Sequence, residues 1–237
     1  MKLLILGQGN VGTHLYTAFT AKHVDCTLHS SWEGLDNLPA ADCILYAVRD
    51  DALEQVAAQV HTDRRVLHLH TSGTMPLTVF GDDKPHAGVF YPLQSFSKSR
   101  PIEDYSSIPV FFEARGIDDV SAIYSLALMI TSHVYEVSQQ DREQLHLCGV
   151  LVNNFPNLMF RIAEDIARRT HVPFSTLLPL IDETAAKVHQ LSPCEAQTGP
   201  AKRGDQNVMN RHLQLLQDPQ IQELYRLCST LIQKLPS

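Results

Sequence analysis

The sequence predicts an α/β fold in which a mostly parallel sheet is followed by an all-helical C-terminal domain. Short apolar runs alternate with amphipathic helical patterns through the first half of the chain, and a glycine-rich turn follows the first run. From about Gln139 onward no convincing strand pattern occurs. Because parallel neighbours need a crossover, usually a helix, the alternation favours parallel pairing. We therefore expect two domains, residues 1–137 and 138–237.

The elements of the N-terminal domain follow from its apolar periodicity. Residues 3–6 are apolar without alternation, which is typical of a strand buried on both faces of a sheet. Strands are expected at residues 3–6, 26–29, 43–48, 65–69, 110–112 and 133–137. Helices are expected at residues 11–22, 51–60 and 117–131.

The C-terminal domain shows helical patterns only. Pro173 interrupts the first pattern and so separates two helices. A loop that contains Pro193, Gly199, Pro200 and Gly204 precedes the last two helices. The four helices are expected at residues 139–170, 174–190, 207–217 and 219–234.

Composition excludes several classes of partner and site. The formal net charge of −7 argues against nucleic acid or an anionic membrane, because both need a basic face. No apolar run approaches the roughly 18 residues that span a bilayer, and the run before Gly7 is too short for a signal peptide. Five scattered cysteines without a C-x-x-C pair favour reduced thiols and no zinc site. The sequence thus predicts a cytoplasmic, metal-free protein.

A glycine-rich turn joins the first predicted strand to the first predicted helix. It reads Gly7-Gln8-Gly9-Asn10-Val11-Gly12. Gly7 allows a tight turn, Gly9 lets the backbone approach a pyrophosphate, and Gly12 permits close packing of helix on strand. The anion then lies at the helix N-terminus, where unpaired N–H groups and the dipole favour it. In this context the turn predicts a Rossmann unit that binds a nicotinamide dinucleotide.

Two other interpretations of the turn stay open. It can be a tight turn that binds no ligand. It can also be the loop of an S-adenosylmethionine site, although such sites usually carry an acidic residue where this chain has Leu6.

The end of the second predicted strand bears on the choice of cofactor. NAD-binding proteins usually carry Asp or Glu there for the ribose 2′-hydroxyl. This chain instead has His29-Ser30-Ser31-Trp32, with Glu33 close by. Because the hydroxyls of Ser30 and Ser31 can donate to a 2′-phosphate, NADP is favoured. NAD remains possible, since the usual arginine is absent and the segment also suits an ordinary polar turn.

Two further segments are expected at carboxyl ends of strands, where ligands bind in open parallel sheets. Ala47 and Val48 are predicted to pass beneath the adenosine and ribose. Thr71 and Ser72 are predicted near the nicotinamide, where their hydroxyls can bind a carbonyl or carboxylate. A plain turn at residues 72–73 is the alternative.

Together with the glycine turn, several motifs carry a family resemblance. They are AVRDD at 47–51, HTSGT at 70–74, GVFYPLQSF at 88–96, His146 with Asn153 and Asn154, and TGPAKRGD at 198–205. On these motifs, and over nearly its whole length, the chain resembles Rossmann-like proteins of largely unassigned function. Their relatives are pyrroline-5-carboxylate reductase, 6-phosphogluconate dehydrogenase and the deazaflavin-dependent NADP reductases. The resemblance implies a helical, 6-phosphogluconate-dehydrogenase-like domain that builds a homodimer, with the site in the cleft between domains.

His146 and Asn153 are the candidate catalytic residues. They lie seven residues apart, so both project from one face of the predicted helix. A histidine can donate a proton to an alkoxide or imine nitrogen, and an amide can position that group. Asn154 is the alternative partner, and a polar cluster at a helix interface is the alternative to catalysis. Related hydroxyacid dehydrogenases carry a lysine four residues before the asparagine, whereas this chain has Gly149 or Val150 there.

Arg203 and Gln94 are the candidate substrate-binding residues. Arg203, beside Lys202 in the loop rich in proline and glycine, can bind an anionic group bidentately, unless the loop is simply solvated. Gln94 can face the same cleft.

These features favour an NADP-dependent oxidoreductase that moves a hydride between the nicotinamide and a small anionic carbonyl or imine. A dinucleotide-binding sensor or partner protein without catalysis is the alternative, and a flavin-like hydride partner is a third. The sequence does not identify the substrate, because a fold does not fix a function.

Overall fold

A computed structural model describes residues 1–30 and 32–234 of the chain. The chain divides into two compact units, Met1–Met159 and Phe160–Ser237. The predicted boundary at residue 137 falls directly after the last strand, whereas the two units divide further on, within a helix. Among the described residues, no helix combines the length and the apolar character that crossing a bilayer requires.

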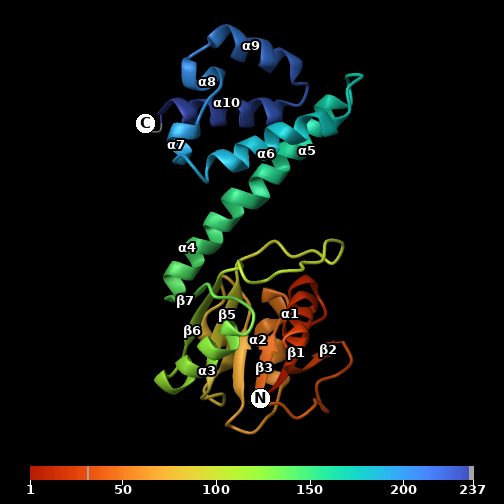
Figure 1. Cartoon of the computed structure of the whole chain (residues 1–237), viewed down its shortest axis with the longest axis vertical. Helices are drawn as coiled ribbons and strands as arrows, with labels where there is room; N and C mark the ends of the chain where they lie inside the picture. The colour runs from red at the N-terminus through yellow and green to blue at the C-terminus, as the bar shows by residue number, and fades with distance from the viewer. Residues whose placement is uncertain (31, 235–237) are drawn as a thin grey trace. The chain divides into compact units, whose positions relative to one another are not determined.

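The first unit is built on a seven-stranded sheet with the order β2-β1-β3-β4-β5-β6-β7 (Figure 1). All neighbouring strands pair in parallel except β5 and β6, which pair antiparallel. The predicted mostly parallel α/β fold is therefore confirmed. The strands are β1 (Lys2–Leu6), β2 (Asp25–His29), β3 (Cys43–Tyr46), β4 (Leu67–His70), β5 (Ala87–Pro92), β6 (Val110–Ala114) and β7 (Val134–Glu136).

Helices cover both faces of this sheet. The first unit contains α1 (Asn10–Ala21), α2 (Asp50–Gln59), the short 3₁₀ helix η1 (Leu77–Phe80), α3 (Ile117–Leu128) and α4 (Gln139–Gly149). A π-helical turn, η2 (Val150–Asn154), links α4 to α5 (Phe155–Ala167). The predicted helix over residues 139–170 is thus one continuous helical stretch that ends at Ala167 and is widened at η2.

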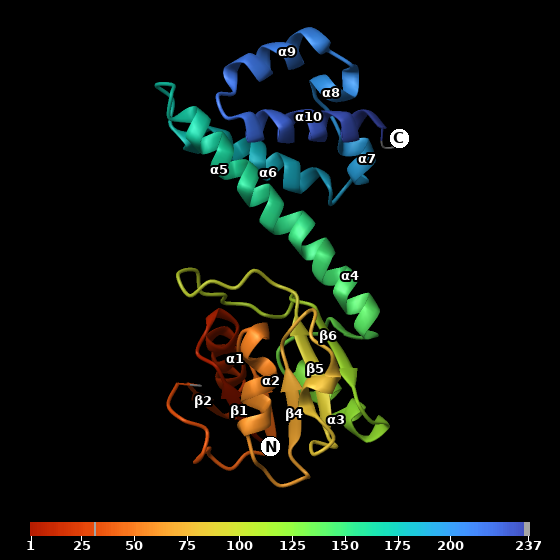
Figure 2. The ribbon, with the colours of Figure 1, turned by 180° about the vertical axis from the view of Figure 1, so that it is seen from behind.

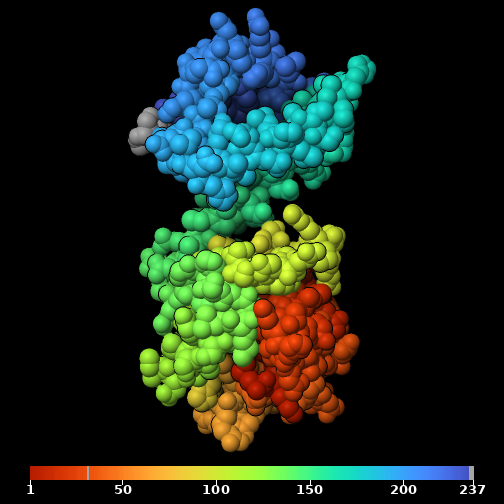
Figure 3. Space-filling model, in the orientation of Figure 1, coloured from red at the N-terminus to blue at the C-terminus, as the bar shows by residue number. Residues whose placement is uncertain are grey.

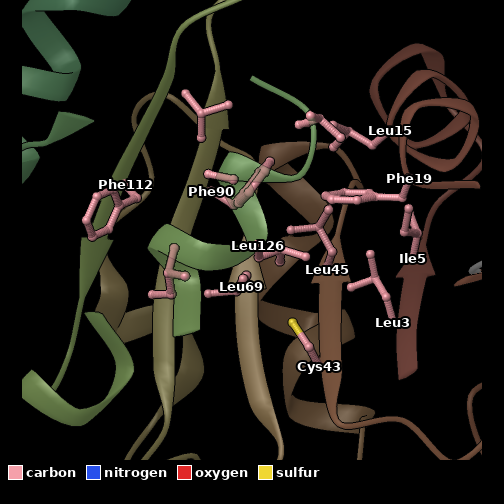
Figure 4. Packing of buried hydrophobic residues seen from close by; sticks show 14 of the residues in the cluster. Leu3, Ile5, Leu15, Phe19, Cys43, Leu45, Leu69, Phe90, Phe112 and Leu126 are labelled. Carbon is pink, nitrogen blue, oxygen red and sulfur yellow. The ribbon is translucent and has the colours of Figure 1, made fainter. Parts of the chain in front are cut away.

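The core lies on both faces of the sheet because successive strand side chains point to opposite faces. Leu3 and Ile5 join a cluster with side chains of α1 and α3, including Phe19 and Leu126 (Figure 4). Leu4 and Leu6 join a second cluster with side chains of α2 and η1, namely Leu53, Ala57, Val79 and Phe80. The uniformly apolar first strand is explained by this burial on both sides.

Strand β5 is the strand that the sequence pattern missed. Its six residues are all buried, but the run begins with Ala87-Gly88 and ends at Pro92, which weakens the strand pattern. A side chain at Gly88 would crowd Ile123 of α3 and the Glu113 carbonyl of β6. Glycine is therefore needed here because β5 closely approaches its antiparallel neighbour and α3.

A long connection between β5 and β6 lies against α1. The Nδ1 atom of His14 is 2.9 Å from the Tyr105 hydroxyl, and its Nε2 atom is 3.0 Å from the Ser97 carbonyl. Figure 3 shows this connection in yellow against the red N-terminal region. The connection therefore has a fixed place beside the glycine turn.

The second unit is helical and contains few buried residues. Its described elements are η3 (Phe174–Leu177), α6 (Leu178–Lys187), α7 (Pro193–Ala196), α8 (Pro200–Arg203), α9 (Gln206–Leu215) and α10 (Pro219–Lys234), with α8 against α10 (Figure 2). The region predicted as a plain loop thus contains two one-turn helices, α7 and α8. Within the described part of this unit only Ala201 and Met209 are buried, while many large apolar side chains are exposed.

Candidate functional site

The glycine turn lies where the sequence places it, between β1 and α1. Gly7 has a φ of +113°, and its N–H donates to the His29 carbonyl at 2.9 Å, which joins the turn to the end of β2. A side chain at Gly7 would collide with the Ala47 carbonyl, and one at Gly12 would collide with the Gly7 carbonyl. Two of the three glycines are therefore required by the turn itself.

Gly9 differs from the other two glycines because nothing surrounds its missing side chain. A Cβ added there would meet no atom within 4 Å. Gly9 is also the N-cap of α1, it makes no side-chain cap, and the first turn of α1 carries no acidic residue. An open backbone at an uncapped helix N-terminus fits the pyrophosphate of a dinucleotide. Gln8 and Asn10, also predicted to bind the cofactor, are exposed on this turn.

The end of β2 is ordered by local hydrogen bonds. Ser30 is buried, and its hydroxyl oxygen accepts from the Trp32 N–H at 3.3 Å. The Glu33 carboxylate lies 3.7 Å from His29 Nδ1, while the Trp32 side chain is 95% exposed. The predicted 2′-phosphate ligand Ser31 lies outside the described residues. Its role and that of Ser30 remain predictions.

The residues that follow β3 flank the turn. Ala47 is buried and contacts Gly7 and Gly12, while Val48 is half-buried beside Gly7. Both shape the floor of the turn, and their contacts with a nucleotide remain a prediction.

Thr71 and Ser72, which follow β4, make hydrogen bonds within the fold. The Thr71 hydroxyl donates to the Tyr46 carbonyl at 3.3 Å. The Ser72 hydroxyl oxygen accepts from the N–H groups of Thr74 and Met75, at 3.1 and 3.0 Å. Ser72 thus stabilises a turn, as the alternative interpretation held. Their place near a nicotinamide stays a prediction.

A pocket of about 490 Å³ opens beside the glycine turn, and it brings several of the predicted residues together. Its lining includes Asn10 and Val11 of the turn together with Gln94, His146 and Asn153. These residues come from both sides of residue 137, and all of them belong to the first unit. The other lining residues are Tyr91, Leu93, Ser95, Phe96, Gly149, Val150, Val152 and Asn154, so the lining contains no Lys, Arg, Asp or Glu.

Tyr91 is one of the site residues to which the sequence analysis gave no role. Its hydroxyl lies 2.9 Å from Nδ1 of His146, and both side chains line the pocket. Burial raises the pKa of Tyr91 to about 12, so the phenol stays protonated near neutral pH. The only sequence signal was a hydroxyl at the end of an apolar run. That signal does not identify a site, because Tyr46 and Tyr105 also form hydrogen bonds with histidines and lie outside the pocket lining.

The π-helical turn η2 falls within the site. Its five residues, Val150–Asn154, include both candidate amides, and π-turns inside α-helices often mark functional sites. The one-face argument for His146 and Asn153 assumed a regular α-helix. Because the wider turn changes the phase after Gly149, both Asn153 and Asn154 line the pocket with His146.

A buried cation lies on the helix that carries His146, and nothing in the sequence pattern indicated it. Arg142 of α4 is 0% exposed and donates to the Ser72 carbonyl at 3.2 Å and to the Glu113 carboxylate at 3.0 Å. The Ser72 N–H donates to Nδ1 of His70 at 3.2 Å. Burial, with a contribution from Arg142, lowers the pKa of His70 to about 3, so the ring is neutral.

Arg203, the predicted anion ligand, ends α8 in the second unit and is exposed. The lining residues of the pocket all belong to the first unit. Among the described residues, His, Cys, Asp and Glu side chains form no group of three that could hold a metal ion.

The family model DUF2520, described as a domain of unknown function, matches residues 108–232. The chain belongs to the DUF2520 family. No curated protein matches this DUF2520 protein.

Solved structures resemble the DUF2520 protein along almost its whole length. The "putative NADP oxidoreductase BF3122" of Bacteroides fragilis is 33% identical, with a TM-score of 0.90 over 99% of this chain and 98% of that one. Protein TM1727 of Thermotoga maritima is 18% identical, with a TM-score of 0.73 over 98% and 97%. The reductive aminase of Aspergillus terreus, in complex with NADPH and ethyl levulinate, is 15% identical, with a TM-score of 0.70 over 98% and 92%. These matches confirm the resemblance and the Rossmann-like fold that the motifs predicted.

Proposed function

We propose that the DUF2520 protein is an NADP-dependent oxidoreductase that acts on a small carbonyl or imine compound. The observation that carries this proposal is the pocket in which the first turn of α1 meets His146 and Asn153. A dinucleotide bound at this turn would share the cavity with a histidine that can donate a proton, as hydride transfer to C=O or C=N requires.

The cofactor assignment is supported by the turn and by the likeness to BF3122. Gly9 leaves room for a pyrophosphate, and the α1 N-terminus offers uncapped N–H groups. BF3122, whose name refers to NADP, is one third identical to this chain. We assign Ser30 to the 2′-phosphate side because it follows β2 directly and no carboxylate occupies that position.

The residues of the pocket would donate the proton, orient the substrate and exclude water. When bound, the reduced nicotinamide supplies the hydride for the electrophilic carbon. His146 donates a proton to the oxygen or nitrogen that gains charge. Asn153 and Gln94 orient the same group through their amides, and the side-chain oxygen of Gln94 already accepts from Ser95 at 2.7 Å. Leu93 and Phe96 exclude water from the cavity.

Arg203 is proposed to hold an anionic group of the substrate. This assignment rests on the chemistry of the guanidinium alone, which can bind a carboxylate bidentately. The comparison of anionic with neutral substrates tests it directly.

A homodimer through the helical unit is proposed from the exposed apolar side chains there. A helical domain normally buries one apolar face of each helix. In α6 and α10, however, Leu180 is 66% exposed and Leu227 is 56% exposed. A second copy of the chain would remove these surfaces from water, and sedimentation equilibrium would measure the dimer.

A dinucleotide-binding protein without catalysis is the second candidate. It is favoured by the absence of lysine at Gly149 and Val150, where related dehydrogenases carry one. Such a protein would bind the dinucleotide equally well but would not need His146.

Two measurements on the whole chain test these candidates. A titration followed by nicotinamide fluorescence should show tighter binding of NADPH than of NADH. A panel of small keto acids, ketones and imines should then give NADPH oxidation. Binding without turnover would favour the non-catalytic candidate, and no binding by folded protein would remove both.

A further inference from the structure

We propose that Tyr91 is a positioning residue that holds His146 so that Nε2 of the imidazole, and not Nδ1, hands the proton to the substrate. This inference rests on the proposed reductase reaction. It goes beyond that proposal because it assigns the reacting atom and a residue that fixes it.

The first observation is the direct contact between the two side chains. The Tyr91 hydroxyl is 2.9 Å from Nδ1 of His146, and Tyr91 is only 8% exposed. Nε2 of His146 has no hydrogen-bond partner among residues 1–30 and 32–234. Since the hydrogen bond at one ring nitrogen sets the role of the other, Nε2 is the atom left for a ligand.

The second observation is the close approach of Gly73. A Cβ added at Gly73 would lie 2.7 Å from Nδ1, 2.8 Å from Cγ and 3.0 Å from Cβ of His146. The Nδ1 side of the ring is therefore covered by Gly73 as well as by Tyr91. A substrate in the pocket can reach the imidazole only at its Nε2 side.

The third observation is that the helix carrying His146 is bonded to the segment after β4 that contains Gly73. Arg142 lies one helical turn before His146 and donates to the Ser72 carbonyl, next to Gly73. Its second bond, to Glu113, neutralises the buried charge. Tyr91 and Gly73 thus contact the ring directly, while Arg142 fixes the helix that carries it, which is how a reacting side chain is pre-organised.

The proton transfer follows from this geometry. In the protonated ring, Nδ1–H donates to the Tyr91 oxygen and Nε2–H points to the substrate. As the hydride of the reduced dinucleotide forms the new C–H bond, the Nε2–H bond breaks and its proton joins the substrate oxygen or nitrogen. The neutral ring keeps Nδ1–H on Tyr91, and a solvent proton returns to Nε2.

The test compares Tyr91→Phe with Tyr105→Phe. The second change removes an equally short, part-buried bond between a tyrosine and a histidine, at His14 and outside the pocket lining. In ¹⁵N spectra of the free protein, assigned with His146→Asn, neutral His146 should show one tautomer. Tyr91→Phe should give a mixture of both, whereas Tyr105→Phe should leave His146 unchanged.

Kinetics supply the second readout. Tyr91→Phe should lower kcat roughly tenfold or more and shift the alkaline limb of its pH profile, where the protonated donor is lost, with the Kd for NADPH unchanged. Gly73→Ala should lower kcat as well, because the added Cβ displaces the ring. An unaltered tautomer population, or an unaltered pH profile, in Tyr91→Phe would overturn the positioning role. If the tautomer changes but the chain oxidises no NADPH, the positioning stands and the proposed reaction fails.

Discussion

Gly12 approaches the carbonyl oxygen of Gly7 so closely that a side chain at residue 12 would overlap it. Gly9, between them in the same turn, faces open space. The first and third glycines are thus explained by the protein's own packing. The second is explained only if something else approaches the backbone there.

Substituting the three glycines singly should separate stability from binding. Gly12→Ala and Gly7→Ala should each destabilise the fold by about 1–3 kcal/mol, because a carbonyl must move. Gly9→Ala should leave the melting temperature nearly unchanged and weaken NADPH binding at least about tenfold, since the methyl group occupies the pyrophosphate side. Thermal unfolding and fluorescence titration measure the two effects. Normal NADPH affinity in Gly9→Ala would contradict the proposed cofactor site.

Ser30 should discriminate between the two dinucleotides. Ser30→Ala removes a hydroxyl at the end of β2, so it should weaken NADPH binding by about 1 kcal/mol and affect NADH little. The single tryptophan, Trp32, is exposed at this strand end, and its emission should respond when either dinucleotide binds. An equal loss for NADPH and NADH would show that Ser30 supports the turn and not the 2′-phosphate.

His146 should matter for turnover and not for cofactor affinity. His146→Ala removes the proton donor of the pocket, so kcat should fall by about 10²–10⁴ while the Kd for NADPH stays the same. Stopped-flow oxidation of NADPH measures the first quantity and fluorescence titration the second. Unchanged turnover would leave the non-catalytic dinucleotide-binding protein as the better description.

Arg203 should act only on charged substrates. Arg203→Gln should raise KM for a keto acid by roughly tenfold or more, the effect of losing a charge-assisted hydrogen bond, and leave KM for a neutral ketone unchanged. Arg211→Gln, also an exposed arginine of the second unit, is the matched control. Equal KM changes for both substrates would remove Arg203 as an anion ligand.

Two buried histidines should make the fold sensitive to acid. Burial, with a contribution from Lys84, lowers the pKa of His68 to about 4, and burial lowers that of His70 to about 3. An unfolded histidine has a pKa of about 6.5, so between pH 6.5 and 4 the unfolded chain binds protons that the folded chain does not. The free energy of unfolding should therefore fall as pH drops through this window.

Urea unfolding from pH 7.5 to 4.5 measures this dependence. His68 alone should contribute on the order of 3 kcal/mol across the window. His68→Gln should flatten the curve, although it also loses bonds to Tyr46 and Thr62. His61→Asn, an exposed position, should leave the slope unchanged. Equal slopes for wild type and His68→Gln would show that this ring does not stay neutral.

Much of the fold was readable from the sequence because burial on both faces leaves continuous apolar runs. Residues 3–6 and the glycine turn sufficed to place β1 and α1. Strand β5 was not readable, since Gly88 and Pro92 give it a turn-like composition, and only its contacts with β6 and α3 require that glycine.

The sequence predicted site residues only where a residue type in a given pattern commonly has one function. The glycine spacing indicated a dinucleotide, and a histidine with amides on one helix indicated a proton donor. Tyr91 and Arg142 could not be found in this way, because their roles depend on partners 55 and 29 residues distant. With twelve histidines in the chain, no pattern could say which of them meets a tyrosine inside a pocket.

The π-helical turn at Val150–Asn154 has a consequence for insertions and deletions. A π-turn amounts to one extra residue in an α-helix, and each residue corresponds to about 100° of rotation. Deleting a single residue there would restore a regular helix without breaking it. Because the wide turn absorbs that extra residue, the helix beyond Asn154 would keep its orientation relative to His146. A deletion in the regular helix between His146 and Val150 would instead rotate Asn153 and Asn154 by about 100° around the axis and separate them from the histidine. The effect of a length change on the site thus depends on whether it falls inside the π-turn or before it.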